Sequence, residues 1–213
     1  MCGIVGYLGN KSAKDVIIKG LKRLEYRGYD SAGISTLQNN KLEITKTQGK
    51  VSDLKDFLTD NSHLGGLGIG HTRWATHGAP NNLNAHPHRD NSGKFSLVHN
   101  GIIENYNSLK LLLKDNGITC KTDTDTEVLV QFMGYLYQKE KLDFVETVRI
   151  ALNQVVGAYG IVVLCEDYPD MLITARLGSP LLLGIGKDEY FVASDSSPII
   201  EYTRNIVFLD EGE

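Results

Sequence analysis

The chain has 213 residues, of which 41 % are apolar and 23 % charged, with a net charge of −4 at pH 7. This composition is typical of a globular protein with one large domain or two small ones, and the net charge gives no electrostatic reason to bind nucleic acid. The start lacks an apolar signal segment, no apolar run approaches the ~20 residues of a membrane-spanning helix, and three scattered cysteines predict no disulfide framework. We therefore expect a cytoplasmic protein that binds neither nucleic acid nor membrane.

Up to residue 99, apolar periodicity and turn residues predict mainly strands. Ser12 is the expected N-cap of a first helix, which ends by Gly28, and Asn39-Asn40 is the expected hairpin turn. The predicted elements are a strand over 2–8, a helix over 12–28, strands over 32–37 and 42–47, a helix over 52–61, and strands over 67–71 and 95–99.

The second half first predicts helices and then strands. The expected elements are helices over 105–116, from Asp125 or Thr126 to about 136, and over 144–155, then strands over 159–165, 171–175, 181–185, 190–193 and 206–209. Several strands lack strict alternation, which is typical of strands covered on both faces. We expect one α+β domain in which helices cover packed sheets. The chain stops directly after a predicted strand, so we also expect it to be part of a longer protein.

Cys2 is the first residue that could carry chemistry. If Met1 is removed, Cys2 carries a thiol and a free α-amino group on the same carbon. A terminal amine titrates at about pH 7.7–8.0, so it can accept the thiol proton, and one residue then supplies both nucleophile and base. If Met1 is retained, that nitrogen is an amide and the base is missing. The alternative is a small, buried, structural cysteine, and position alone does not decide between them.

Polar and glycine residues also cluster in three segments, 24–33, 70–78 and 98–105. In the second segment Arg73 directly precedes Trp74, the only tryptophan of the chain. An arginine can bind a carboxylate through two parallel hydrogen bonds. Beside an aromatic wall, Arg73 is therefore a candidate anchor for the α-carboxylate of an amino acid.

Asn100-Gly101 follows the predicted strand 95–99 and allows two interpretations. Asn-Gly is a strong signal for a type I′ hairpin turn, which is the ordinary interpretation. The functional interpretation is an oxyanion hole, in which the Asn100 amide and the Gly101 backbone N–H stabilise a developing negative oxygen.

Taken together, the motifs resemble those of class II glutamine amidotransferases, in the same order. They are Cys-Gly-Ile-Val-Gly at 2–6, the Arg27-Gly28 and Arg73-Trp74 segments, Asn-Ala-His-Pro-His at 84–88, His-Asn-Gly at 99–101 and Thr-Asp-Thr-Glu at 124–127. Segments 25–33 and 71–78 are most similar to the glutaminase domains of the glutamine–fructose-6-phosphate aminotransferases (isomerizing). Phosphoribosyl amidotransferases typically carry other versions of these segments. The resemblance covers residues 2–213 as one glutaminase domain.

The resemblance implies a four-layer αββα N-terminal-nucleophile hydrolase fold, with two antiparallel sheets between helical layers. It also implies a reaction centre in which Cys2 attacks the side-chain amide of glutamine. Asn100 and Gly101 would hold the oxyanion, and Arg27 would lie close to the nucleophile and help set the electrostatics of the site.

The resemblance further implies a substrate site for L-glutamine. Arg73 would bind the α-carboxylate and Asp125 the α-ammonium group, for which Asp123 is the competing candidate. The remaining residues expected around the substrate are Trp74, Thr76, His77 and His86. His86-Pro-His88 places two imidazoles close together, but no cysteine or helix-spaced pair supports them, so we expect no metal and no cofactor.

The partners implied are L-glutamine, L-glutamate and C-terminal isomerase domains that are absent from this chain. Those domains would use the ammonia for glucosamine-6-phosphate synthesis, and the full-length enzyme could be a homodimer. Two alternatives stay open. One is a glutaminase domain that serves phosphoribosyl pyrophosphate as acceptor, and the other is a non-catalytic domain that only binds glutamine.

Overall fold

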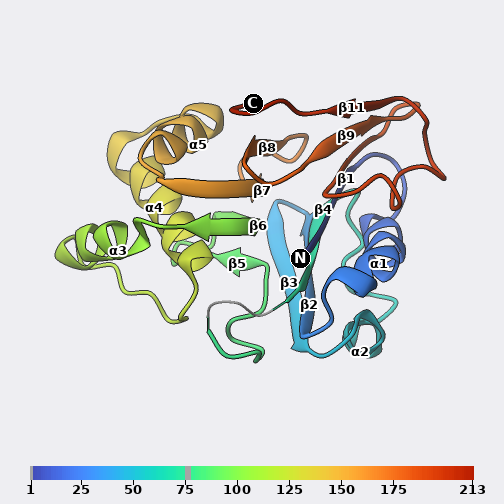
Figure 1. Ribbon diagram of the computed structural model, residues 1–213, viewed down its shortest axis with the longest axis horizontal. Helices are drawn as coiled ribbons and strands as arrows, with labels where there is room; N and C mark the ends of the chain where they lie inside the picture. The colour runs from blue at the N-terminus through green and yellow to red at the C-terminus, as the bar shows by residue number, and fades with distance from the viewer. Residues whose placement is uncertain (1, 75–77) are drawn as a thin grey trace.

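The computed structural model describes residues 2–74 and 78–213. Within these ranges two antiparallel sheets pack face to face, and helices cover both outer faces (Figure 1). The first sheet has the strand order β11-β9-β10-β1-β4-β2-β3, and the second has the order β5-β6-β7-β8. The expected αββα sandwich is therefore confirmed.

The first sheet consists of β1 (Gly3–Leu8), β2 (Ser31–Gln38), β3 (Lys41–Gln48), β4 (Leu67–Arg73), β9 (Leu182–Ile185), β10 (Tyr190–Ala193) and β11 (Ile206–Phe208). The second consists of β5 (His88–Arg89), β6 (Phe95–Ile103), β7 (Gly157–Cys165) and β8 (Leu172–Leu177). The helices are α1 (Ala13–Leu24), the short 3-10 helix η1 (Glu25–Arg27), α2 (Val51–Phe57), α3 (Tyr106–Asp115), α4 (Asp125–Glu140) and α5 (Phe144–Asn153).

The helices divide between the two outer faces. On the first sheet, α1 buries Ile17 and Leu21 in a core that includes Ile34 of β2, and α2 adds Leu54. The expected N-cap is confirmed, because Ser12 Oγ accepts the backbone N–H of Asp15. On the second sheet, α3, α4 and α5 enclose a separate apolar core. Each sheet thus has one face against helices and the other against its partner sheet.

The layer between the sheets explains where polar residues gather. Ile4 of β1, Ile69 of β4 and Val98 of β6 are completely buried in one cluster between the sheets. Side chains of a strand alternate between its two faces, so every second residue faces the partner sheet.

The same faces continue into polar residues. By this alternation Cys2 shares the inward face of Ile4, and Asn100 shares that of Val98. His71 and Arg73 likewise share the inward face of Ile69. Register places these ends together, since Gly3 pairs with Thr72 and Ile4 with His71. The apolar layer therefore ends in a polar group at one end of the sandwich.

Two turn predictions had different outcomes. The hairpin at Asn39-Asn40 is confirmed, with φ values of 50° and 56° that suit a type I′ turn. The hairpin interpretation of Asn100-Gly101 is wrong, because both residues continue β6 and pair with Gly160 and Tyr159 of β7. Tertiary pairing with β7 overrides the local turn preference.

The other differences concern boundaries. Helix α2 ends at Phe57 rather than at residue 61, and β5 was missed because two residues are too few to show alternation. Helix α4 begins at Asp125, as one of the two expected starts, with Thr124 as N-cap accepting the N–H of Glu127 at 3.2 Å. No helix in residues 2–74 and 78–213 combines the length and apolar character that crossing a membrane requires.

Candidate active site

The Cys2 thiol lies at the meeting point of β1 and β4. Its Sγ accepts the backbone N–H of Trp74 at 3.2 Å, and Sγ lies 3.6 Å from the Trp74 carbonyl oxygen. Burial raises the pKa of this thiol, whereas the Trp74 hydrogen bond and the positive charge of Arg73 lower it. A partly buried thiol that needs help to ionise fits a nucleophile that depends on an adjacent base.

Arg27 lies at the end of η1, and it contacts the two residues that directly follow β10. Its guanidinium forms an ion pair with Asp195 at 2.6 Å and donates to the Ser194 carbonyl at 3.3 Å. The Ser194 hydroxyl in turn accepts the backbone N–H of Ile4 at 3.0 Å. These contacts connect Arg27 to the strand that follows Cys2. A direct electrostatic role of Arg27 at the thiol stays a prediction.

Asn100 reaches from the second sheet to the nucleophile. Its Nδ2 donates to the backbone carbonyl of Cys2 at 3.2 Å, and its Oδ1 lies 3.0 Å from Nε2 of the buried His71. The amide therefore lies beside Cys2 with its donor end turned toward it. This is the placement that an oxyanion donor needs.

Gly101 is the next residue of β6 and lines the same cavity as Cys2. Its φ of +126° and the carbonyl of Ala158 both exclude a side chain, because a Cβ atom there would lie 2.0 Å from that oxygen. Only glycine fits this approach of β6 to β7. The sequence signal Asn-Gly thus marks a glycine that close strand packing requires.

The small cavity at Cys2 brings together most of the expected site residues. It is lined by Cys2, Arg73, Trp74, His86, His99, Gly101, Thr124, Asp125 and Thr126. Thr76 and His77, also expected there, lie outside the described residues. The cavity lining thus includes the Cys2 thiol, the Arg73 guanidinium and the Asp125 carboxylate.

Arg73 and Asp125 place opposite charges around this cavity. The Arg73 guanidinium is buried, and it donates to the carbonyls of Gly78 and Ala79 at 3.3 and 3.5 Å. Asp125 is buried at the start of α4, where its Oδ2 accepts the backbone N–H of Ile103 at 2.8 Å. An amino acid carries a carboxylate and an ammonium group on one carbon, so such a pair of charges suits its head group.

His86 belongs to a buried group of histidines behind the cavity. The ring centroids of His71 and His86 are 4.2 Å apart, and those of His86 and His88 are 4.8 Å apart. Burial, together with the repulsion of neighbouring rings, holds the pKa of His86 well below its usual range. Within the described residues no cluster of His, Cys, Asp and Glu could hold a metal ion.

Lys46 of β3 holds the segment that carries His86. Its Nζ donates to the backbone carbonyls of Leu83, Ala85 and Pro87 at 3.1, 2.7 and 3.3 Å. Burial lowers the pKa of Lys46 to about 8. The lysine thus acts as a side-chain clamp on the loop before β5.

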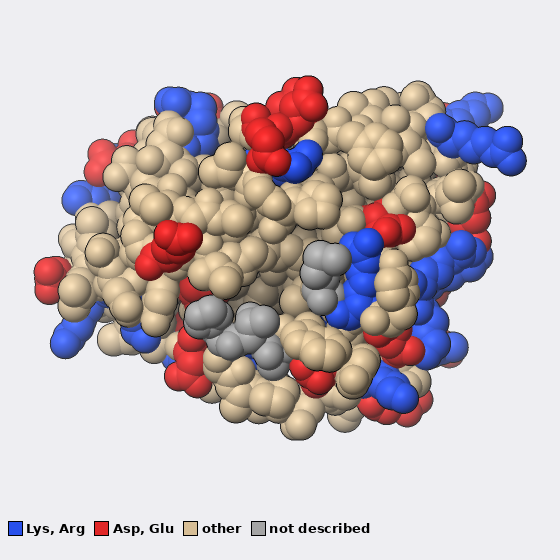
Figure 2. All heavy atoms as spheres, viewed as in Figure 1, with Lys and Arg blue, Asp and Glu red and all other residues tan. Residues whose placement is uncertain are grey.

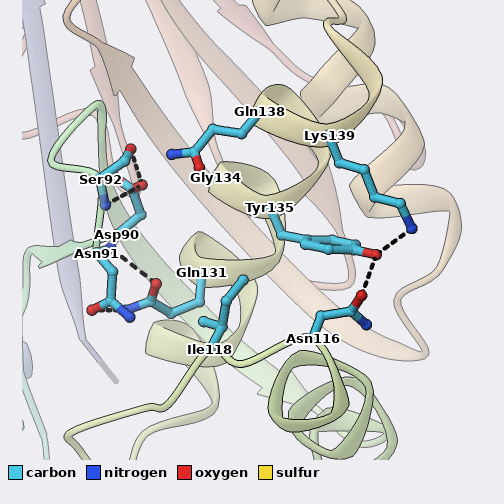
Figure 3. Close-up of a pocket in the computed structure, with 10 residues that line it drawn as sticks. All are labelled: Asp90, Asn91, Ser92, Asn116, Ile118, Gln131, Gly134, Tyr135, Gln138 and Lys139. Carbon is cyan, nitrogen blue, oxygen red and sulfur yellow. Dashed lines mark hydrogen bonds between the residues drawn. The ribbon is translucent and has the colours of Figure 1, made fainter.

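A wider hollow lies along α4 and the loop after β5 (Figure 3). Its polar groups bond to one another: Tyr135 donates to Asn116 and accepts from Lys139, and Gln131 accepts the backbone N–H of Asn91. The residues lining it include no thiol, histidine or arginine. Mutually satisfied side chains without a nucleophile make this hollow a weaker candidate than the cavity at Cys2.

Basic side chains gather on the side of the molecule that carries α1 (Figure 2). Lys19 and Arg23 pair with Glu201 at 2.8 and 2.7 Å, and Lys22 pairs with Glu25 at 2.6 Å. Each of these basic side chains is therefore paired with a carboxylate.

Several residues that organise the site were missed by the sequence reasoning. The sequence analysis assigned no role to His71 or His99, and Ser194 and Asp195 belong to none of its motifs. His99 Nδ1 lies 3.0 Å from Thr126 Oγ1 and 4.0 Å from Asp125 Oδ2. Alternation along 67–73 could have placed His71 on the same face as Ile69 and Arg73. No local signal identifies residues 194–195, because they meet Arg27 through the tertiary fold.

Comparison with known proteins identifies the family of this chain. A family model described as a glutamine amidotransferase domain matches residues 46–210. The glutamine–fructose-6-phosphate aminotransferase (isomerizing) of Bacteroides thetaiotaomicron is 53 % identical over 100 % of this chain and 35 % of its own length. That of Pyrococcus horikoshii is 51 % identical over 100 % of this chain and 36 % of its own length. The chain thus spans about a third of the length of these relatives.

Solved structures show the same fold. The glutamine phosphoribosylpyrophosphate amidotransferase from B. subtilis, complexed with ADP and GMP, matches with a TM-score of 0.79 and 28 % identity, over 99 % of this chain and 45 % of that one. A structure described as the allosteric regulatory enzyme of purine biosynthesis matches with a TM-score of 0.81 and 29 % identity, over 99 % and 45 %. The sandwich is therefore that of the N-terminal-nucleophile hydrolases, and the chain belongs to the class II glutamine amidotransferase family.

Proposed function

We propose that the chain is a glutaminase, which hydrolyses L-glutamine to L-glutamate and ammonia once Met1 has been removed. The observation that carries this proposal is the juxtaposition of three groups. The Cys2 thiol lines one small cavity with Arg73 and Asp125, and the Asn100 amide donates to the backbone carbonyl of Cys2 beside it. They supply a nucleophile, an oxyanion donor and two charges for an amino acid head group.

The first half of the reaction forms a thioester. The α-amine of Cys2 takes the thiol proton, and Sγ bonds to the side-chain carbonyl carbon of glutamine. The carbonyl oxygen becomes an oxyanion, which accepts hydrogen bonds from Asn100 Nδ2 and the Gly101 backbone N–H. The C–N bond then breaks, the leaving nitrogen takes the proton from the Cys2 ammonium, and ammonia departs.

The second half releases glutamate. Water gives a proton to the Cys2 amine and adds to the thioester carbonyl, which restores the oxyanion in the same place. The C–S bond then breaks, and the thiolate recovers its proton. Arg73 and Asp125 keep the head group fixed throughout, so that both attacks occur in the same geometry.

We further propose that residues 2–213 form the glutaminase domain of a longer chain that transfers the ammonia to fructose 6-phosphate. Relatives with that name are 53 % and 51 % identical, whereas the phosphoribosylpyrophosphate amidotransferase is 28 % identical. C-terminal isomerase domains as the receiving partner, and a homodimer of the longer chain, belong to this proposal. An assay of the longer protein with fructose 6-phosphate and with phosphoribosyl pyrophosphate shows which of these two acceptors receives the ammonia.

The first experiment combines intact mass with glutamine hydrolysis on the same sample. A mass without Met1, with equal amounts of glutamate and ammonia formed, supports the glutaminase. Cys2→Ala must abolish this turnover. The matched control is Cys120→Ala, since Cys120 lies outside the cavity and burial raises the pKa of its thiol to about 11. A processed chain that binds glutamine without turnover contradicts the proposal and supports a non-catalytic binding domain.

A further inference from the structure

The Asn100 side chain lies between a histidine and the nucleophile. Its Oδ1 is 3.0 Å from His71 Nε2, and its Nδ2 is 3.2 Å from the Cys2 carbonyl oxygen. An asparagine amide donates hydrogen bonds only from its nitrogen. A half-turn of this amide would present its oxygen to the oxyanion, and repulsion would replace stabilisation. The orientation of Asn100 therefore matters as much as its presence.

The contacts of His71 show which ring nitrogen carries the proton. Nε2 lies 3.1 Å from the backbone carbonyl oxygen of His99 as well as 3.0 Å from Asn100 Oδ1. A carbonyl oxygen only accepts hydrogen bonds, so Nε2 carries the proton and donates. Nδ1 is buried and has no hydrogen-bond partner among the described residues, as expected for the unprotonated nitrogen.

The surroundings keep His71 neutral and in place. Burial lowers the pKa of His71 to about 3, and the hydrogen bond to Asn100 only partly offsets this. The ring packs against that of His86, with an interplanar angle of 34° and centroids 4.2 Å apart. His71 pairs with Ile4 of β1 and Gly33 of β2, so strands on both sides fix its backbone. A neutral, rigid imidazole presents one N–H group to the Asn100 oxygen.

We propose that His71 is a positioning residue, whose Nε2–H holds the Asn100 amide with its N–H group toward the carbonyl that Cys2 attacks. The inference rests on the proposed glutaminase function and adds to it a residue that acts through the oxyanion donor. His71 is not among the residues that line the cavity at Cys2. Its effect is expected on the chemical step and not on glutamine binding.

The test compares His71→Leu, which removes the donor, with His71→Gln, whose amide nitrogen reaches about as far as Nε2. We expect His71→Leu to lower kcat for glutamine hydrolysis by about 10- to 100-fold with KM within about twofold. His71→Gln should recover most of kcat. His63 is the matched control, since it is also buried and bonds to Thr36 and Thr45 at 2.8 and 2.9 Å near the opposite end of β4. His63→Leu should retain kcat in the fraction that folds.

A double-mutant cycle separates positioning from a general structural effect. In an Asn100→Ala background, His71→Leu should change kcat by less than about twofold, because the amide it orients is gone. An equal loss in both backgrounds overturns the proposal. So does a folded His71→Leu variant with wild-type kcat.

Two further readouts keep the outcome decisive. If His71→Leu does not fold, His71→Asn replaces it, because the shorter amide cannot reach Asn100, and kcat should be at least about fivefold below that of His71→Gln. Equal kcat values for these two variants contradict the proposal.

The turnover of the wild-type chain is measured in the same experiment. A wild-type chain without glutaminase activity contradicts the proposed function, whereas an active wild type with His71-independent kcat contradicts the role of His71 alone.

Discussion

The backbone N–H of Trp74 donates a hydrogen bond to Cys2 Sγ at 3.2 Å, and Gly28 makes this approach possible. A Cβ atom at Gly28 would lie 2.9 Å from the carbonyl carbon of Arg73 and 3.0 Å from the nitrogen of Trp74. The glycine of the Arg27-Gly28 motif thus allows residues 73–74 to lie against the loop after η1. The motif supports the thiol through the backbone of β4.

Gly28→Ala should therefore lower activity in the fraction of the protein that folds. The added methyl must displace the backbone at residues 73–74, and a shift of about 1 Å at a reacting group can reduce rates about 10²-fold. We expect kcat to fall at least tenfold, measured by glutamate release. The matched control is Gly117→Ala, where φ is +78° but no atom lies within 4 Å of the added methyl. That variant should lose stability and retain kcat, and wild-type kcat in Gly28→Ala would contradict this role.

Asn100→Ala should reduce the chemical step and spare binding. Removal of one oxyanion donor typically costs about 10²–10³ in turnover. We expect kcat to fall by that factor, while the dissociation constant for glutamine, measured by calorimetry on an inactive Cys2→Ala background, changes less than about threefold. An unchanged rate in a folded variant would remove Asn100 from the oxyanion hole.

Asp125→Asn should weaken recognition of the α-ammonium group. A hydrogen bond to a charged group contributes about 1.5–3 kcal/mol, so KM for glutamine should rise roughly 10- to 100-fold. Glutaramic acid, which is glutamine without its α-amino group, should show little change in KM, because it cannot form this contact. Asp123→Asn is the matched control at the competing carboxylate, which is exposed and faces Asn84. A rise in KM with Asp123→Asn instead would reassign the role.

Removal of Met1 should shift the pH dependence of Cys2 alkylation. While the Cys2 nitrogen is part of a peptide bond, burial holds the pKa of the thiol above its usual range. After processing, an amine that titrates at about pH 7.7–8.0 is available to take the proton. The rate of iodoacetamide reaction, resolved by peptide mass spectrometry, should reach half its maximum at lower pH in the processed chain. Cys165 is an internal reference, since burial raises the pKa of its thiol to about 12. Identical pH profiles of Cys2 alkylation with and without Met1 would argue against the amine as base.

The buried histidines predict that stability falls in mild acid. The pKa of His88 lies well below its usual range in the folded chain because of burial, whereas an unfolded histidine titrates near 6.5. Below pH 6.5 the unfolded state therefore binds more protons, so the free energy of unfolding decreases as pH falls. Each such histidine contributes a slope of about 1.4 kcal/mol per pH unit.

Urea unfolding at pH 7.5 and 5.5 checks this prediction. The free energy of unfolding should be lower at pH 5.5, and the difference between the two pH values should shrink by about 1 kcal/mol in His88→Gln. The comparison uses a difference within each variant, so a uniform loss of stability in His88→Gln does not affect it. An unchanged difference would contradict the histidine as its source.

Much of the architecture could be predicted because it depends on local patterns. Alternation and capping identify β1, the hairpin of β2 and β3, and α1 with its Ser12 N-cap. Short or context-dependent pieces could not be found in this way. Strand β5 has two residues, and Asn100-Gly101 favours a turn locally but is drawn into β6 by pairing along the whole of β7.

The sequence by itself determined the family, the αββα class and the chemical types of the site residues, because motif order and side-chain chemistry are properties of the chain. Only the tertiary structure decided how those residues cooperate. It places the Trp74 backbone N–H against Cys2 Sγ and turns the Asn100 amide nitrogen toward the Cys2 carbonyl. It also places His71 Nε2 against the Asn100 amide oxygen. These residues are up to 98 positions apart, and their contacts depend on strand register and sheet packing, which no local pattern of residues encodes.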